Sequence, residues 1–396
     1  MSGNPVRSIV HMDLDSFFVS VELLRRPELK GKPLIIGGSN ERGVVASCSY
    51  EARKFGIHSA MSSQKAKQLC PHAIFIGGDM DEYSKHSKII RQIIHDKAPF
   101  YEQASIDEFY LDITGMDRFF GIEKLTSELR QFIIKESGLP ISCGLSINKI
   151  VSKIATGLSK PNGMLNVPAG TEKQFLAPLP IEKIPMVGKR TTAILHQAGI
   201  FDIGTLSNTP VLKLEKLLGK HGSGLWMRAN GIDHTPIDPY SERKSISTET
   251  TFHEDSKDAH SMRISLLQMV EELSFALRQK KFLTGCLTVK IKYSTFEKET
   301  KQCSFSYTSS DAVLMEKIKP LFDSLYNKQK YVRLIGVRLS NLVHGNYQAN
   351  LFEQPEKTHN LYAAMDAIRV KYGHDAVKRV LAGKKSHRNR DPQDPD

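Results

Sequence analysis

Short apolar runs alternate with longer segments of helical periodicity along the first 170 residues of the chain. Short runs rich in β-branched or aromatic side chains and bounded by turn residues predict strands. Such runs occupy about 8–12, 33–36, 43–47, 106–113 and 141–146. Apolar positions that repeat every three or four residues predict helices at 17–30, 49–56, 81–98, 125–137 and 148–159. This mixture predicts an α+β fold.

After residue 245 the pattern predicts six elements in the order strand, helix, strand, strand, helix, strand. Their expected ranges are 245–253, 258–281, 285–293, 299–308, 311–327 and 331–343. This order predicts a split antiparallel sheet with both helices on one face, which leaves the other face open. The segment 233–245 contains Pro236 and Pro239 with mixed charge, and we expect it to be a linker. A further helix is expected at 359–381, followed by a polar, disordered end.

The charge of the chain is unevenly distributed. The formal net charge is +12, of which +4 lies in 1–242, +6 in 243–347 and +2 in 348–396. Half of the excess therefore falls in about a quarter of the chain, which indicates a polyanion-binding module there. Ordinary solvated lysines are the alternative explanation.

The five cysteines are scattered, odd in number and never spaced as Cys-x-x-Cys. This pattern favours a reducing compartment and argues against a zinc site or a disulfide framework. No apolar run approaches the roughly 18 residues of a membrane span, and the N-terminus shows no signal-peptide pattern. With 396 residues, the chain is expected to be a cytoplasmic protein of two to four domains.

The stretch 105–112 places two adjacent carboxylates, Asp107 and Glu108, inside a run of strand-forming residues. Neighbours in a strand point to opposite faces, so both acids can face one ligand only if the chain turns between them. A hairpin would leave them at an exposed strand tip, where a divalent cation would relieve their repulsion. A solvated turn is the alternative.

A second acidic pair, Asp13 and Asp15, follows the first predicted strand. An Asp at the carboxyl end of a strand lies where α/β sheets bind ligands, so Asp13 is assigned to a metal. Asp13 and Asp15 are two residues apart, so a continued strand would place both on one face. We favour for Asp15 the N-cap of the following helix, because Asp is common there. Two strand-borne carboxylate sites suit a pair of Mg²⁺ ions about 4 Å apart, an arrangement typical of phosphoryl transfer.

The segment 47–56 predicts a short helix with Ser49 as N-cap and Gly56 just after its end. Tyr50 and Arg53 share one face of this helix. A helix N-terminus with a hydroxyl, a Tyr and an Arg beside it suits a triphosphate. Lys160, in a predicted turn, is placed to reach a phosphate. A short surface helix and a solvated lysine are the alternatives.

Five motifs occur in the order and spacing of the Y-family DNA polymerases, and the chain resembles the bacterial DNA polymerase IV branch over residues 1 to about 345. The motifs are Met12-Asp13-Leu14-Asp15-Ser16-Phe17-Phe18, Ser49-Tyr50-Glu51-Ala52-Arg53-Lys54-Phe55-Gly56, Ser105-Ile106-Asp107-Glu108, Gly144-Leu145-Ser146-Ile147-Asn148-Lys149 and Lys160-Pro161-Asn162-Gly163. The resemblance implies a right-hand polymerase with a ferredoxin-like palm, small fingers, a helical helix-hairpin-helix thumb and a βαββαβ little finger. The implied domains are palm 1–16 and 81–170, fingers 17–80, thumb 171–236, linker 237–244, little finger 245–345 and a tail, 346–396.

The resemblance also implies the active-site roles. Asp13, Asp107 and Glu108 would be the catalytic and metal-binding carboxylates for two Mg²⁺ ions, with the backbone carbonyl of Leu14 as a further ligand. Phe18 would be the steric gate, whose ring leaves no room for a ribose 2′-hydroxyl; the residues alone would assign Phe18 to core packing. The nucleotide-binding residues would be Phe17, Phe18, Ser47, Tyr50, Arg53 and Lys160.

Residues 184–189 resemble a helix-hairpin-helix turn, whose N–H groups face a DNA phosphate. Met186 occupies the position of the first hairpin Gly, which departs from the family pattern. A second such turn is expected at 218–222. With the basic side chains of the little finger, the expected DNA contacts are Val187, Gly188, Lys189, Arg243, Lys244, Lys290, Lys292, Arg333 and Arg338.

Residues 348–352 resemble the short peptide with which bacterial polymerases bind the sliding clamp, with Gln348, Leu351 and Phe352 as the anchors. The function implied is an error-prone, template-directed translesion DNA polymerase without proofreading. Its partners would be primer-template DNA, deoxynucleoside triphosphates and the clamp, and we expect a monomer. The alternatives are a nucleotidyl cyclase-like palm enzyme and a non-catalytic DNA-binding protein.

Overall fold

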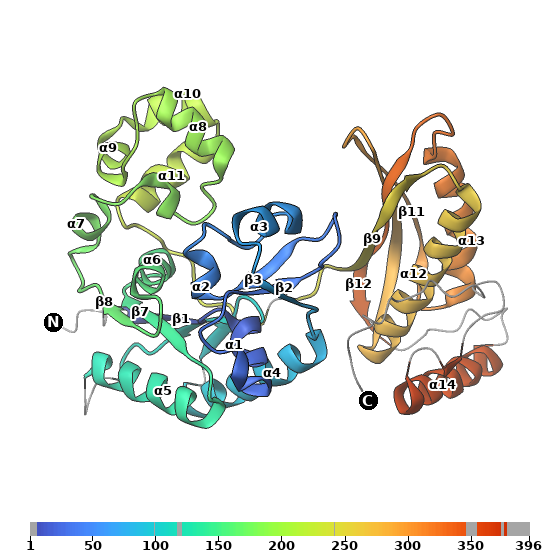
Figure 1. Ribbon diagram of the computed structural model, residues 1–396, viewed down its shortest axis with the longest axis horizontal. Helices are drawn as coiled ribbons and strands as arrows, with labels where there is room; N and C mark the ends of the chain where they lie inside the picture. Colours follow the sequence, from blue (N-terminus) through green and yellow to red (C-terminus); the bar gives the residue numbers. More distant parts are fainter. Residues whose placement is uncertain are drawn as a thin grey trace. The chain divides into compact units, whose positions relative to one another are not determined.

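The computed structural model describes residues 6–98, 100–116, 121–240, 242–345, 355–373 and 376–377. The chain divides into two compact units, 1–241 and 242–396. The first unit contains a five-stranded sheet, a three-stranded sheet and a group of short helices, and the second contains a four-stranded sheet with its own helices (Figure 1). The α+β, multidomain fold predicted from the sequence is confirmed.

The five-stranded sheet has the order β5-β6-β1-β7-β8. Its strands are β5 (Tyr101–Gln103), β6 (Glu108–Asp112), β1 (Ile9–Leu14), β7 (Ile141–Ser146) and β8 (Met164–Asn166). Both neighbours of the central strand β1 run antiparallel to it, while β8 is parallel to β7. Because side chains alternate along a strand, Val10, Met12 and Leu14 of β1 enter one apolar core. The intervening Asp13 belongs to the other face.

Helices cover both faces of this sheet (Figure 1). One face packs against α4 (Met80–Lys97) and α5 (Ile122–Ser137), whose apolar residues join the same core as β1. On the other face α6 (Lys149–Ser159) lies across β7 and β1. The side chain of Asn148 caps α6 by accepting a hydrogen bond from the N–H of Val151. This face therefore places the lysines of α6 next to the ends of the central strands.

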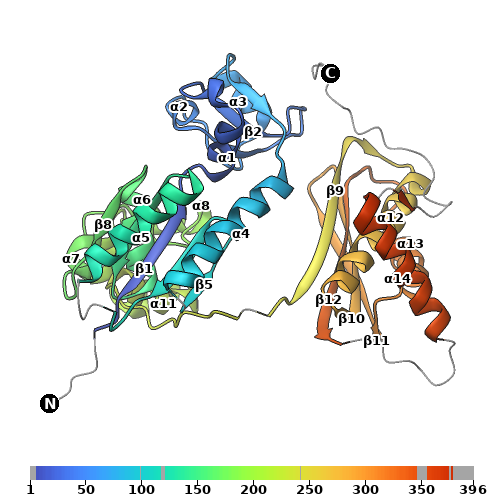
Figure 2. The same ribbon diagram turned by 90° about the horizontal axis from the view of Figure 1, so that it is seen from below.

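The three-stranded sheet has the order β3-β2-β4 and lies apart from the first sheet (Figure 2). The strands predicted at 33–36 and 43–47 are both present, as β2 and β3, and they pair in antiparallel fashion. The predicted N-cap Ser49 is confirmed too, since its side chain accepts the N–H of Ala52. The elements of this region are α1 (Phe17–Arg25), η1 (Pro27–Leu29), β2 (Leu34–Gly37), β3 (Val45–Cys48), α2 (Tyr50–Arg53), α3 (Ser63–Leu69) and β4 (Ile74–Ile76).

The rest of the first unit is helical and has its own apolar core. Its elements are α7 (Glu172–Leu176), η2 (Ile181–Lys183), α8 (Lys189–Gln197), α9 (Ile203–Asn208), α10 (Val211–Leu218) and α11 (His221–Ala229). Two turns match the predicted hairpins. The first joins η2 to α8, with Gly188 as the N-cap of α8, and the second joins α10 to α11 through Gly219, whose φ is +62°.

The second unit has the predicted order of six elements. They are β9 (Ser245–Ser256), α12 (Ala259–Gln279), β10 (Phe282–Tyr293), β11 (Lys298–Thr308), α13 (Asp311–Leu325) and β12 (Val332–His344). The antiparallel sheet has the order β11-β10-β12-β9. Alternate residues of β10 and β12 pack against α12 and α13, so the helices cover one face and the opposite face carries the intervening polar residues. The predicted split sheet is confirmed.

The last described helix, α14 (Pro355–Tyr372), begins and ends earlier than the predicted helix at 359–381. Gly373, with φ +93°, ends it. The predicted clamp peptide, 348–352, and the segment expected to be disordered, 382–396, lie outside the described residues. Across the described part of the chain, no helix has the length and apolar character needed to cross a membrane.

Candidate active site

The three predicted carboxylates belong to neighbouring strand ends. Asp13 of β1 and Glu108 of β6 are cross-strand partners, and the N–H of Leu14 donates to the carbonyl of Asp107 at 3.1 Å. The chain turns between β5 and β6, and the Oγ of Ser105 accepts the N–H groups of Asp107 and Glu108. The predicted hairpin is therefore present, and it brings Asp107 and Glu108 to the end of the strand that carries Asp13.

Lysine side chains contact two of these carboxylates. Lys160 binds Asp13 through its ammonium group, and Lys153 of α6 lies 2.6 and 2.7 Å from the two oxygens of Glu108. Lys153 was not among the predicted site residues, although its spacing from Lys149 already placed both on one face of a basic helix. The site therefore contains lysine ammonium groups next to two of its carboxylates.

The carboxylates interact electrostatically. Burial raises the pKa of Asp13 to about 7, Lys160 opposes this rise, and the charges of Glu108 and Asp107 add to it. Within the described ranges, no three His, Cys, Asp or Glu side chains form a ready-made metal site. The donors are nevertheless all hard oxygens, which suit Mg²⁺, and two of the three acids already bind a cationic group. The residues therefore fit a divalent metal once the lysine ammonium groups move aside.

Asp15 does not cap the following helix, and this prediction was wrong. The N-cap of α1 is Ser16, in the left-handed region at φ 44°, and it makes no side-chain cap. The buried carboxylate of Asp15 instead accepts hydrogen bonds from the Oγ of Ser142 at 2.8 and 3.0 Å, from the backbone N–H of Asn162 at 2.7 Å and from the Tyr50 hydroxyl at 3.3 Å. Strand β1 ends at Leu14, and the side chain of Asp15 is directed towards β7. Through its bond to the N–H of Asn162, Asp15 fixes the turn that carries Lys160.

The predicted triphosphate residues lie around this anchor. The Arg53 guanidinium donates to the Oγ of Ser16 at 3.2 Å and lies 4.7 Å from the centre of the Tyr50 ring. Burial, followed by the charge of Asp15, raises the pKa of Tyr50 to about 12, so its hydroxyl stays protonated as a donor. Lys160 is 3.7 Å from Asp15. Tyr50, Arg53 and Lys160 are thus gathered at one point, while Ser47 is buried on β3.

The two adjacent phenylalanines differ in their surroundings. Phe17 is buried in the core, which leaves only its backbone available to a nucleotide. Phe18 is partly buried and stacks on Tyr83, with ring centroids 4.3 Å apart and planes inclined by 12°. The hydroxyl of Tyr83, itself buried, donates to Glu22 at 2.9 Å. Tyr83, which sequence analysis did not identify, therefore holds the ring of Phe18 in place.

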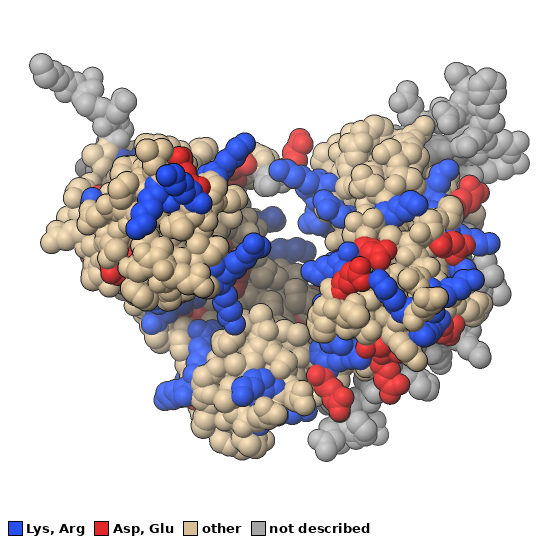
Figure 3. All heavy atoms as spheres, turned by 90° about the horizontal axis from the view of Figure 1, so that it is seen from above, with Lys and Arg blue, Asp and Glu red and all other residues tan. Residues whose placement is uncertain are grey.

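Some predicted DNA-binding residues are already engaged. Lys290 pairs with Glu249 at 2.7 Å, and Arg333 lies 4.0 Å from Asp255. By contrast Arg338 is exposed on the sheet face opposite α12 and α13. Figure 3 shows basic side chains on both units, with acidic ones interspersed on the second. Further exposed predicted contacts are Gly188, Lys189, Arg243 and Lys244.

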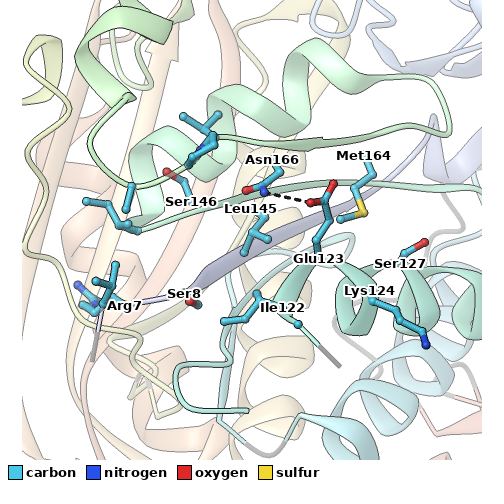
Figure 4. Close-up of a pocket in the computed structure, with 16 residues that line it drawn as sticks. Arg7, Ser8, Ile122, Glu123, Lys124, Ser127, Leu145, Ser146, Met164 and Asn166 are labelled. Atoms are coloured by element: carbon cyan, nitrogen blue, oxygen red, sulfur yellow. Dashed lines mark hydrogen bonds between the residues drawn. The ribbon is translucent and has the colours of Figure 1, made fainter. Parts of the chain in front are cut away.

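A cavity of about 830 Å³ lies at the opposite end of the five-stranded sheet, near the start of β1 (Figure 4). It is bounded by the first turn of α5 and by the ends of β7 and β8, and a hydrogen bond of 3.3 Å from Asn166 to Glu123 crosses it. None of the predicted site residues within the described ranges lines it. The candidate active site is therefore defined by its side chains and not by this cavity.

Comparisons with known proteins agree with this geometry. The profile of the impB/mucB/samB family matches residues 12–157, that of its C-terminal domain matches 243–351, and the helix-hairpin-helix motif of the IMS family matches 170–200. A protein of Dehalococcoides mccartyi named DNA polymerase IV is 39% identical over 94% of this chain and 97% of its own length. Relatives of the same name in Treponema denticola and Listeria monocytogenes are 36% and 38% identical, covering 93% and 85% of this chain and 95% of each relative.

Among solved structures, a Y-family DNA polymerase chimera, Dbh-Dpo4(243-245)-Dbh, is similar with a TM-score of 0.76 and 29% identity. The match covers 85% of this chain and all of the chimera. The family match, the similar relatives and the shared fold agree with one another. The chain therefore belongs to the impB/mucB/samB family and is a Y-family DNA polymerase.

Proposed function

We propose that this polymerase extends a primer 3′ end with deoxynucleotides on damaged templates, as an error-prone translesion enzyme similar to its relatives named DNA polymerase IV. The observation that carries the proposal is the meeting of Asp13, Asp107 and Glu108 at adjacent strand ends. Basic and hydroxyl side chains suited to a triphosphate lie next to them. We assign residues 1–345 to palm, fingers, thumb, linker and little finger, and we propose that none of these carries a proofreading exonuclease.

Y-family DNA polymerases depend on metal ions, and we assign two Mg²⁺ ions to the carboxylates of Asp13, Asp107 and Glu108 and the backbone carbonyl of Leu14. The oxygen donor set supports this choice, as do the ammonium groups of Lys153 and Lys160 that now neutralise two of the acids. When bound, two such metal ions activate the attacking hydroxyl and stabilise the leaving pyrophosphate.

The chain's own residues then bind and orient the incoming nucleotide. Arg53 donates to phosphate oxygens in a planar, bidentate geometry, and the protonated hydroxyl of Tyr50 adds a neutral donor. Lys160, which contacts Asp13 in the structure, would supply its ammonium group to the triphosphate when a metal ion is held by that carboxylate. We assign Ser47 to the same phosphates through its position on β3, next to the start of α2.

Sugar selection is assigned to Phe18. Its ring is held by the parallel stack on Tyr83, so it is unable to swing away from an added 2′-hydroxyl. A rigid aromatic surface excludes that hydroxyl by contact, which discriminates against ribonucleotides without any hydrogen bond. The hydrogen bond from Tyr83 to Glu22 supports the rigidity of the stack.

Primer-template DNA is assigned to the hairpin turns and to the open face of the four-stranded sheet. The exposed backbone around Gly188 supports a phosphate contact, and Lys292 and Arg338 supply charge on the open sheet face. We assign the sliding clamp to the peptide 348–352, on the strength of its sequence alone. The enzyme is proposed to act as a monomer, one chain to each primer end.

Primer extension with purified protein tests the proposal. Asp107→Asn and Glu108→Gln should each reduce extension by at least about a thousandfold, since each removes a carboxylate from the reacting centre, while DNA binding should remain. Asp112→Asn, at the other end of β6, is the matched control and should retain activity. Full activity in the first two variants, or production of cyclic nucleotides in place of extended primer, would contradict the assignment.

A further inference from the structure

Helix α14 is attached to the second unit by polar contacts. Asp366 accepts two hydrogen bonds from Arg278 of α12, at 2.7 and 2.9 Å, and Arg369 binds Glu271 of the same helix. The hydroxyl of Tyr362 lies 3.3 Å from the backbone N–H at the start of α13. Tyr362, Asp366 and Arg369 are each less than 8% exposed. Figures 1 and 2 both show α14 beside α12 and α13, and these contacts fix which side of the helix faces solvent.

The apolar side chains of α14 form a separate stripe. Leu361, Met365, Ile368 and Tyr372 follow the i, i+4, i+7, i+11 spacing that places residues on one face of a helix. Leu361, Ile368 and Tyr372 are 56%, 40% and 67% exposed. A surface helix normally turns such a stripe towards the core, yet none of these residues belongs to the described apolar core of this unit. The stripe is therefore an exposed apolar surface on an anchored helix.

The position of α14 in the chain indicates its partner. The helix begins at Pro355, three residues after Phe352, the last residue of the peptide that we assign to the sliding clamp. Three residues span at most about 10 Å, so a protein that holds this peptide must lie next to α14. We propose that the stripe of Leu361, Met365, Ile368 and Tyr372 is a second docking surface for the sliding clamp. This inference rests on the clamp partner in the proposed function.

The size of the stripe favours this partner over a second copy of the chain. Its exposed apolar surface is on the order of 300 Å², well below the roughly 800 Å² per partner of a stable independent interface. Such a patch increases affinity when another segment of the same chain is already bound to the partner. Binding of the patch is then effectively intramolecular and needs little apolar area. The family profile ends at residue 351, before the helix begins, so this surface is additional to the matched domain.

Binding of the full chain to purified sliding clamp tests the inference. Leu361→Gln combined with Ile368→Gln keeps good helix formers and should weaken clamp binding roughly tenfold through lost apolar burial. Clamp-free primer extension should stay unchanged. Val370→Gln is the matched control: Val370 is 66% exposed, about 180° around the helix from Leu361, and clamp binding should not change. In the wild-type chain, clamp addition should slow amide hydrogen exchange over 361–372.

Three results would overturn the inference. Unchanged clamp affinity in the double variant together with unchanged exchange in the wild type would remove α14 from the interface. Loss of self-association in the double variant, with clamp affinity intact, would assign the stripe to a second copy. Absence of any clamp binding by the wild type would remove the partner itself. Leu351→Ala with Phe352→Ala distinguishes the failures, since it tests the peptide while the stripe is intact.

Discussion

Met186 has a backbone conformation that its side chain disfavours. Its φ is +72°, and its side chain is 87% exposed at the first hairpin turn, so no packing offsets the strain. The family pattern has Gly at this position, where such a conformation costs little. The structure shows that the turn still forms, with the N–H of Val187 donating to the carbonyl of Ile184. The hairpin thus retains its shape at a local cost in free energy.

Met186→Gly should therefore stabilise the protein. We expect the free energy of unfolding to rise by roughly 0.5 to 1 kcal/mol, because relief of the left-handed strain exceeds the added freedom of Gly in the unfolded chain. Thermal or urea unfolding measures the change. Met186→Ala retains a β-carbon and should bring no gain; equal stabilisation by both substitutions would indicate that the strain is not the cause.

Phe18→Val should allow ribonucleotide incorporation. In the role proposed for Phe18, loss of most of the ring would open the space below the sugar, and we expect the preference for deoxynucleotides to fall at least tenfold, on the order of 1.4 kcal/mol or more. Steady-state incorporation of matched ribo- and deoxynucleotides measures the ratio. Val19→Ala, a core substitution on the same helix, should reduce stability and leave the ratio unchanged. Equal sugar selection by Phe18→Val and wild type would remove Phe18 from this role.

The sequence predicts local geometry best where it depends on neighbouring residues. The hairpin expected around Asp107 and Glu108 is present: the turn after β5 ends at Asp107, and Glu108 begins β6. Lys153 was missed as a partner of Glu108 because the two lie 45 residues apart and meet only when α6 crosses the sheet. Asp15 was misassigned for the same reason, since Ser142 is 127 residues away. Partners that depend on tertiary packing leave no local signal.

At the scale of elements, periodicity identified most strands and helices of the chain, because each buries one face against a neighbour. Strand β7 and the order of the six elements in the second unit are clear cases. For helix α14 the hydrophobic pattern predicted the wrong bounds. Its buried side is polar and its apolar stripe is exposed, so the hydrophobic pattern gave neither its start nor its docking face.

Helix α12 offers a test of capping that depends on pH. The Asp258 carboxylate accepts hydrogen bonds from Ser261 Oγ at 2.5 Å and from the N–H groups of His260 and Ser261. The bond from the Ser261 hydroxyl is the main cause that lowers the pKa of Asp258 below its usual value of 3.8. A lowered folded-state pKa stabilises the protein above the unfolded value, and this stabilisation is lost as pH falls through the folded value.

Asp258→Ala should therefore lower the melting temperature by roughly 3 °C at pH 7, as loss of a helix cap does. The difference from wild type should shrink at a pH well below 4, where the wild-type carboxyl is protonated. Melting curves across this range provide the measurement. Asp258→Asn keeps an acceptor and should lose less stability at pH 7; a pH-independent gap between wild type and Asp258→Ala would contradict a charged cap.

At the scale of the whole molecule, net charge is a poor guide to the charge available for DNA. Half of the net positive charge of the chain lies in residues 243–347 of the second unit. On the open sheet face, however, the ammonium group of Lys290 on β10 is neutralised by the carboxylate of Glu249 on β9. A lysine already held by a carboxylate releases fewer counterions when it meets a phosphate. Cross-strand pairing, which composition does not reveal, thus sets how much unpaired positive charge this face offers to a polyanion.

Glu249→Gln should therefore strengthen DNA binding by freeing Lys290. We expect the slope of log K against log salt to steepen by up to about 0.9, the contribution of one phosphate contact, with the largest gain in affinity at low salt. Fluorescence anisotropy over a salt series measures the slope. Asp323→Asn is the matched control, because it frees Arg263 from a 2.6 Å ion pair between α12 and α13, on the covered side of the sheet. An equal change in both variants would indicate that net charge acts at a distance, whereas a change in Glu249→Gln alone would place the DNA backbone on the open face.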